Sequence, residues 1–183
     1  TTIQNGCNCE NSSYHALESV VEKRFSKGYS LNSALTWSKA IDARGAPNPA
    51  FRQSGRGLSE FDRAFSWVFS HLWELPYGPG MRWGSSVTGI RKIALAGWKF
   101  NGVTTYQSGF PLTPVLSNNS TLNADFTQRP DISSDYHLSD PDRARWYNPA
   151  AFAAPAQCCR LGNAGTNIIH GPRLVTADWA FGK

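Results

Sequence analysis

Four cysteines are the residues whose spacing first suggests chemistry in this chain. They form two close pairs, Cys7 with Cys9 and Cys158 with Cys159. An even number of paired cysteines is typical of proteins that fold in an oxidising compartment. The spacings Cys-x-Cys and Cys-Cys differ from the Cys-x-x-Cys pattern of common zinc sites. Disulfides are therefore the chemistry that these cysteines favour.

Metal and hydrolase sites are the two alternatives that the polar residues leave open. The histidines that could join the cysteines around a metal are His15, His137 and His170. A hydrolase site could use Ser70 with His71, or Asp140 with His170, but triads are recognised by geometry and not by spacing. Gly-x-Ser-x-Gly does not occur, and the Gly-rich stretches SGRG and GNAGTN match no phosphate-binding fingerprint. We predict no metal, no cofactor and no catalytic residue.

A ligand-binding function is suggested by the stretch DPDRARWYNPAAF at residues 140–152, which mixes cations with aromatic rings. The candidate ligand-binding residues are Arg143, Arg145, Trp146 and Tyr147. The alternative is a loop that packs on its own aromatics, because a long ordered loop needs an anchor.

Length and composition limit the classes of protein to which the chain can belong. Its 183 residues suffice for one domain, and 13% of them are aromatic while only 17% are charged. The net charge of +5 is scattered along the sequence, so we expect no nucleic-acid partner. No apolar run reaches the ~18 residues of a transmembrane helix. The start at Thr1 without a methionine suggests a fragment or a processed product.

The elements that must position these residues are strands, because apolar and polar residues alternate over long stretches. In FDRAFSWVFSHLWELPYGPG, residues 61–80, nearly all aromatics have odd numbers. A period of two over ten or more residues is typical of a strand with two different faces. We predict one segment, 1–183, with strands at about 13–25, 29–41, 61–76, 98–112 and 173–183, a long loop at 117–172, and a possible short helix in SVTGIRKIALAG.

Strand length and loop asymmetry favour part of a transmembrane β-barrel, an all-β antiparallel meander of long strands. Strands of 10 to 16 residues exceed the usual length in globular sheets and suit a bilayer crossing. The alternative is a soluble β-sandwich or small barrel with an aromatic inner face. The residues predicted to share the apolar face are Leu31, Leu35, Phe65, Trp67, Phe69, Trp98, Tyr106 and Trp179. Those predicted on the opposite face are Asn32, Thr36, Ser66, Ser70, Asn101, Thr105 and Asp178.

Counting strand crossings gives a prediction for the cysteines. The short turn at residues 26–28 falls on the periplasmic side, so both cysteine pairs fall on the extracellular side. A bridge within either tight pair is strained, and long-range pairing is geometrically easier. We predict at least one disulfide from Cys7 or Cys9 to Cys158 or Cys159; the alternative is four free thiols. The bridge would close about 150 residues and contribute roughly 4–5 kcal/mol.

Five stretches of the chain, in the same order, resemble one known family. They are YHALESVVEKRFSKGYSLNSALTWSKAID, FDRAFSWVFSHLWELPYGPG, LAGWKFNGVTTYQSGFPLTP, RWYNPAAFAAP and LGNAGTNIIHGPRLVTADWAFGK, which cover most of residues 13–183. They are similar to TonB-dependent receptor-like outer-membrane proteins with a carboxypeptidase-regulatory-like N-terminal domain, of the acidobacterial type.

The resemblance implies a C-terminal barrel fragment of such a receptor, in the outer membrane of a Gram-negative bacterium. The family's barrel is plugged by an N-terminal domain and imports a bulky ligand with energy delivered through TonB. The implied partners are outer-membrane lipid, an unknown ligand, and the TonB complex through an N-terminal part that this sequence does not include. The alternative function is an independently folding soluble β-rich protein, including a small hydrolase.

Overall fold

The structure is a computed structural model that describes residues 11–43, 55–117, 128–142, 144–156 and 160–183. The chain divides into two compact units. The strand unit comprises Leu17–Trp37, Phe65–Gln107 and Leu174–Lys183. The loop unit comprises the described parts of Thr1–Ala16, Ser38–Ala64 and Ser108–Arg173.

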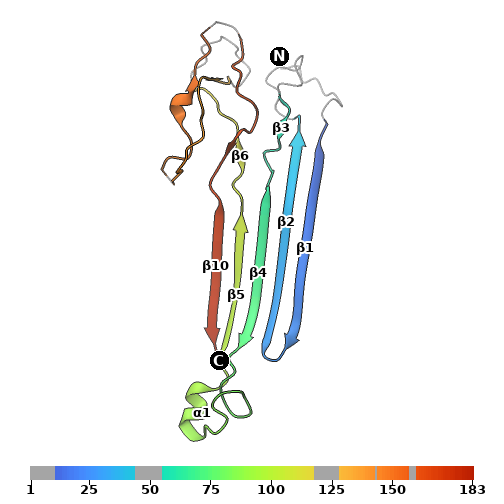
Figure 1. The fold of residues 1–183 in the computed structure, drawn as a ribbon, viewed down its shortest axis with the longest axis vertical. Helices are drawn as coiled ribbons and strands as arrows, with labels where there is room; N and C mark the ends of the chain where they lie inside the picture. The colour runs from blue at the N-terminus through green and yellow to red at the C-terminus, as the bar shows by residue number, and fades with distance from the viewer. Residues whose placement is uncertain (1–10, 44–54, 118–127, 143, 157–159) are drawn as a thin grey trace, which may run out of the picture. The chain divides into compact units, whose positions relative to one another are not determined.

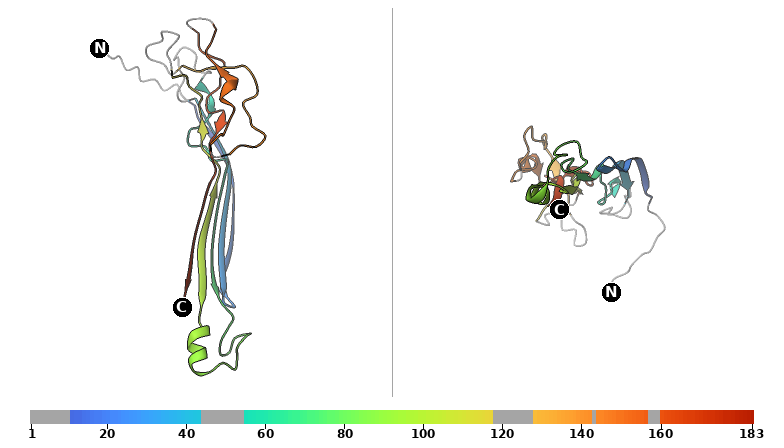
Figure 2. Two further views of the ribbon diagram at one scale, coloured as in Figure 1. Left: turned by 90° about the vertical axis from the view of Figure 1, so that its left-hand side faces the viewer. Right: turned by 90° about the horizontal axis from the view of Figure 1, so that it is seen from below.

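Long strands in the order β1-β2-β4-β5-β10 form the main sheet, so each pairs with its neighbour along the chain (Figure 1). The pairings recorded for β2–β4, β4–β5 and β5–β10 are antiparallel, so the predicted all-β antiparallel meander is confirmed. The bounds are β1 Ser13–Ser26, β2 Tyr29–Asp42, β4 Phe65–Glu74, β5 Lys99–Gln107 and β10 Leu174–Gly182. These strands run side by side in Figure 1 and in the left view of Figure 2.

Short elements fill the connections between the long strands. β3 (Gly57–Leu58) pairs with the end of β2, β6 (Pro111–Leu112) pairs with β9 (Ile169–His170), and β7 (Asp131–Ile132) pairs with β8 (Phe152–Ala153). A short 3₁₀-helix, Pro149–Ala151, precedes β8. Helix α1 (Gly89–Leu95) lies between β4 and β5 and confirms the helix expected there. In its described part, the predicted loop 117–172 contains the β7–β8 pair and supplies β9 to the pair with β6.

The turn between β1 and β2 explains why this hairpin closes tightly. Lys27 and Gly28 both have positive φ, +54° and +79°. This is the geometry of the two-residue type I′ turn, whose twist matches that of the strands. Glycine adopts it without strain, and the backbone N–H of Glu74 donates to the carbonyl of Gly28 at 2.7 Å. The turn thereby also carries a hydrogen bond from β4.

The bounds predicted for the third strand, 61–76, are wrong at its beginning. Phe61 lies in a turn, and β4 begins only at Phe65. The backbone N–H of Asp62 donates to Ser59, and its carboxylate accepts from the N–H of Ala40 at 2.6 Å. These bonds bend the chain before β4, and alternation cannot reveal the bond to Ala40 because it joins residues 22 positions apart.

The bounds predicted for the fourth strand, 98–112, are wrong at its end. β5 ends at Gln107, and Phe110 lies outside it. Arg63 donates to the carbonyl of Ser108 at 2.6 Å, and a Cβ on Gly109 would collide with the carbonyl of Gly171. The close approach of two backbones at Gly109 ends the long strand and starts the short β6–β9 pair.

The strand register confirms the predicted two faces. Opposite residues of paired strands share a face, and Trp67 lies opposite both Leu35 and Tyr106. The apolar face carries Tyr29, Leu31, Leu35, Trp37, Phe65, Trp67, Phe69, Trp73, Phe100, Tyr106, Val175, Trp179 and Phe181. The polar face carries Ser30, Asn32, Thr36, Ser66, Ser70, Glu74, Lys99, Asn101, Thr105, Gln107, Thr176 and Asp178, with a few small or aliphatic residues between them. Trp98 precedes β5 and stacks on Phe181 at 4.7 Å, so it belongs with the apolar face.

Candidate functional site

The polar face of the strand unit borders a hollow of about 830 Å³. Two complete cross-strand rows of this face line it. One runs Asn32, Ser70, Val103 and Asp178, and the other runs Ser30, Leu72, Asn101 and Ala180. The row between these two also lines it, with Leu31, His71, Gly102 and Trp179, as do residues 22–25 of β1. The hollow is therefore bounded by hydroxyl, amide and carboxylate groups together with apolar side chains.

One ion pair marks the end of this polar wall. Glu74 and Lys99 are direct cross-strand partners, and their charged atoms lie 2.9 Å apart. Opposite charges in such positions stabilise a sheet modestly when water reaches them. The wall as a whole can hydrogen-bond water or a polar solute along several strands.

On the apolar face, aromatic rings of neighbouring residues contact one another and remain exposed. Phe69 stacks on His71 at 5.4 Å, and His71 lies 5.0 Å from Phe100. Gly102 leaves the space over β5 that the ring of Trp179 occupies. Trp179 is 66% exposed and Trp37 is 65% exposed. In water such a surface would be a large unfavourable patch.

Two indole N–H groups on this face are satisfied within the face itself. Trp67 donates from Nε1 to Oγ of Ser33 at 2.9 Å, and Trp179 donates to Oγ1 of Thr104 at 3.4 Å. Small hydroxyl residues between the rings therefore serve as acceptors. This arrangement suits surroundings that offer no hydrogen bonds, because an unpaired N–H would be costly there.

The predicted ligand-binding residues of the 140–152 stretch lie in the loop unit. The indole N–H of Trp146 donates to the carbonyl of His170 at 2.6 Å, and Tyr147 packs edge-on against Phe152 at 5.8 Å. Both rings therefore help to hold the loop together, as the alternative interpretation expects. The backbone N–H of Arg145 is fixed by the carboxylate of Asp142 at 2.6 Å, while Arg145 is exposed. Arg143 lies outside the described residues, and ligand binding stays a prediction.

An ion pair braces the β7–β8 part of the loop unit. Arg160 binds both carboxylate oxygens of Asp131, with the Nη1–Oδ1 distance at 3.0 Å. Asp131 also accepts the backbone N–H of Asn163, whose side chain accepts from Ile132 in turn. The hydrogen bond from Arg160, followed by the one from Asn163, holds the pKa of Asp131 below its usual value. The same pair raises the pKa of Arg160.

The hydrolase candidates are not assembled into a site. Ser70 and His71 are consecutive residues of β4, so their side chains point to opposite faces. Within the described parts of the chain, no hydrogen bond joins Asp140 to His170, and no group of three metal-ligating side chains gathers. In the same residues, no helix combines the length and apolar character needed to cross a membrane.

Sequence reasoning missed the residues that join distant parts of the loop unit. Asn167 donates from Nδ2 to the carbonyl of Leu58 at 2.6 Å and accepts from Oγ1 of Thr113 at 2.8 Å. The guanidinium of Arg63 lies 3.4 Å from the ring centre of Phe110. The φ of +55° at Asn167 is a conformation that asparagine tolerates better than most residues, and this is the one local signal.

All four cysteines lie outside the described residues, so the disulfide between the two pairs stays a prediction. The prediction of a single barrel segment over 1–183 likewise stays a prediction.

Comparison with known proteins agrees with the two-faced sheet. A family model described as outer membrane beta barrel domain matches residues 1–183. Neither the curated proteins nor the solved structures gave a match. An apolar face of exposed rings and a polar face of hydroxyl and amide groups are what a barrel strand presents to lipid and to its interior. The chain belongs to the outer membrane beta barrel domain family and is located in the bacterial outer membrane.

Proposed function

We propose that this chain is part of a TonB-dependent receptor that takes up a bulky ligand across the outer membrane. The observation that carries the proposal is the polar wall, with its hollow of about 830 Å³ over several strands. A wall of serine, asparagine and aspartate side chains suits a wet passage or the seat of a plug domain. The five co-linear sequence stretches that resemble such receptors support the same function.

The open sheet supports a barrel wider than these five strands. In the described part of the chain, the sheet path ends at β1 on one side and at β10 on the other. Closing a barrel takes about eight strands at the least. Further strands must pair with both edges, since an open edge in lipid leaves backbone groups unsatisfied. A larger barrel leaves room for a bulky solute, which a minimal one does not.

We further propose Arg143, Arg145, Trp146 and Tyr147 as contacts to the ligand. Trp146 and Tyr147 are held by His170 and Phe152, so their rings are positioned before a ligand arrives. A positioned loop loses less conformational entropy on binding. Arg145 supplies an exposed cation beside these rings, which suits a ligand that carries carboxylate or phosphate groups.

The test compares loss of uptake in three cultures of the source bacterium. One lacks the gene for this protein, one lacks TonB, and one is treated with a protonophore. Depletion of compounds from a complex medium is followed by mass spectrometry. We expect the compounds that are no longer depleted after gene deletion to be no longer depleted in the other two cultures as well. Compounds whose uptake stops on gene deletion but continues without TonB would identify a passive channel instead.

The loop contacts are tested once such a compound is found. Arg145→Ala should weaken its capture by about tenfold, the effect of losing one charged contact. Arg173→Ala removes another exposed arginine of the same unit and should leave capture unchanged. Equal capture by both variants and the unmodified protein would exclude this loop from ligand binding.

A further inference from the structure

The connection between β4 and β5, residues 75–98, exposes apolar side chains that the fold does not cover. Ile90 is 84% exposed and Ile93 is 70% exposed, and Met81 and Trp83 are also exposed. No residue of α1 is buried. A water-exposed connection of a soluble protein would carry polar residues at these positions, since exposed apolar clusters mark interaction sites. We call this connection the anchor segment.

The anchor segment is also strictly cationic. Its charged residues are Arg82, Arg91 and Lys92, and it contains no aspartate or glutamate. Within α1, Ile90 and Ile93 are three positions apart and share one side of the helix, while Lys92 lies on the other. One turn of helix thus separates an apolar side from a basic one, the pattern of a helix lying in a membrane interface.

The segment is held in shape by hydrogen bonds of its own backbone. The N–H of Trp83 donates to Pro76 at 3.1 Å, and its carbonyl accepts from Gly78 at 2.8 Å. The helix ends with the N–H of Ala96 donating to Lys92 at 3.0 Å. Gly84 has φ of +71° and leaves no space for a side chain against the ring of Tyr77.

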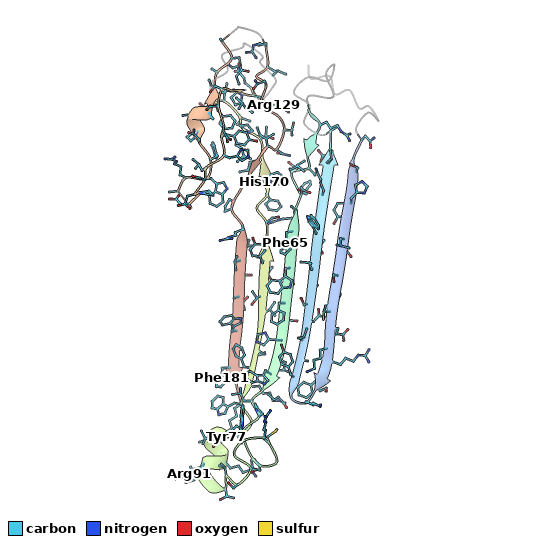
Figure 3. The ribbon with its side chains drawn as sticks, viewed as in Figure 1. Phe65, Tyr77, Arg91, Arg129, His170 and Phe181 are labelled. Carbon is cyan, nitrogen blue, oxygen red and sulfur yellow. The ribbon has the colours of Figure 1, made fainter. Side chains whose placement is uncertain are left out.

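One tryptophan connects the anchor segment to the lipid-facing side of the sheet. The indole N–H of Trp98 donates to the carbonyl of Ala94, in α1, at 2.8 Å. The same indole stacks on Phe181 of the apolar face, with 4.7 Å between ring centres. The ammonium of Lys183 lies 5.7 Å from the Trp98 ring. Figure 3 shows Phe181, Tyr77 and Arg91 succeeding one another at this end of the strand unit.

We propose that the anchor segment is an interfacial anchor that binds anionic phospholipid headgroups, on the membrane side where the β1–β2 turn lies. Ile90 and Ile93 enter the boundary between headgroups and acyl chains, and Arg82, Arg91 and Lys92 contact phosphate groups. Long basic side chains reach the headgroups while their stems stay in apolar surroundings. Continuity with the lipid-facing rings through Trp98 assigns this surface to lipid and not to a second protein. The inference rests on the outer-membrane location and is independent of the transport proposal.

The first experiment locates Trp83 relative to the acyl chains. The full chain and its Trp83→Phe variant are reconstituted in phosphatidylcholine vesicles with about 30% phosphatidylglycerol, an anionic surface. The lipids carry bromine near the start of the acyl chains, or none. The fluorescence difference between the two proteins is the emission of Trp83. It should fall at least twofold with brominated lipid and should not change when protein is diluted in lipid. An unquenched Trp83 beside quenched sheet tryptophans overturns the proposal, and quenching that changes on dilution assigns the surface to a second copy.

Matched variants then test the two halves of the anchor. Ile90→Asp with Ile93→Asp should abolish the quenching of Trp83, whereas Ser85→Asp with Ser86→Asp adds the same charge at exposed positions and should preserve most of it. Arg91→Gln with Lys92→Gln should reduce quenching in the anionic vesicles to the level seen in pure phosphatidylcholine. Equal quenching of the unmodified protein in both vesicles overturns headgroup binding. Gel mobility of the folded form is recorded for each variant, and the Trp83 measurement stands alone if one fails to fold.

Discussion

The strand unit and the loop unit differ in how far their side chains are buried. In the described parts of the chain, the side chains removed from water lie in the loop unit, among them Ala151, Ala164, Ile169 and Asn167, whereas the only buried residue of the strand unit is Gly78. The large aromatics of the sheet stay exposed. The loop unit thus has a small core of its own, and the sheet depends on lipid to cover its rings.

This difference shows where each unit obtains its stability. The sheet is held by backbone pairing between strands, and its apolar face becomes favourable only in a bilayer. In the loop unit, buried polar groups such as Asp62 and Asn167 fix the fold through hydrogen bonds to distant backbone. The stability of the sheet therefore depends on the bilayer and that of the loop unit on its polar network, and substitutions can affect one without the other.

Trp67→Arg is expected to give the largest effect, because it places a cation on the lipid-facing side of a central strand. The cost near the middle of a bilayer is about 2–4 kcal/mol. Ser66→Arg adds the same side chain to the polar face one residue earlier and should cost much less. Folding of both variants in the barrel is measured by urea titration in vesicles. Equal penalties would mean that the two faces do not meet different surroundings.

Asn167→Ala tests the polar network of the loop unit. The change removes hydrogen bonds to Leu58 and Thr113 and puts alanine at a positive φ. We expect a loss of about 2–3 kcal/mol in local stability, because half-buried partners are left unpaired and the backbone is strained.

Amide exchange near Thr113 and Leu58 measures this loss. Asn163→Ala is the control, since it removes another asparagine side chain of the same unit, which accepts a solvent-exposed hydrogen bond from the N–H of Ile132. The comparison between units predicts that Asn167→Ala leaves urea unfolding of the sheet unchanged. If Asn167→Ala lowered both the amide protection of the loop unit and the urea resistance of the sheet, the stabilities of the two units would depend on each other.

Gly162→Ala tests how closely backbones pack within the loop unit. A Cβ at this position would overlap the carbonyl of Pro130, and neither backbone can move without breaking the hydrogen bond from Gly162 to Arg129. The expected cost is about 1–3 kcal/mol, typical of overpacking. Limited proteolysis of the 128–164 region should accelerate. Gly182→Ala, where nothing lies near the added atom, should have no such effect, and a similar acceleration there would refute the packing argument.

Acidification is expected to give the smallest effect, through Asp131. Its pKa is lower in the folded protein than in the unfolded chain, so the ion pair stabilises the loop above the unfolded value of about 3.9. That contribution is lost as pH falls through the folded pKa. Water still reaches both groups, which are half-buried, so the effect is small and weakens with salt. Protection of the Asn163 amide, taken relative to the intrinsic exchange rate at each pH, should fall in acid, and Asp131→Asn should remove this pH dependence. An unchanged dependence in the variant would assign it to another group.

The alternation of residues by itself determined the sheet's two faces and the order of its strands. The period is two because a barrel strand meets lipid on one side and a polar interior on the other, and each residue must suit its own side. Residues such as Leu35, Trp67 and Tyr106 were therefore assigned to one face from parity alone, and the register places them opposite one another. The short hairpin turn followed from Gly28, whose positive φ the sequence also suggests.

Only the tertiary structure decided where the strands end and how the connections fold. Phe61 and Phe110 continue the alternation, yet contacts of Asp62 with Ala40 and of Arg63 with Ser108 take them out of β4 and β5. The attachment of α1 to the lipid-facing side depends in the same way on Trp98 meeting Phe181. Each of these contacts joins residues more than twenty positions apart, and local periodicity carries no information about such pairs because it reflects only the surroundings of one strand.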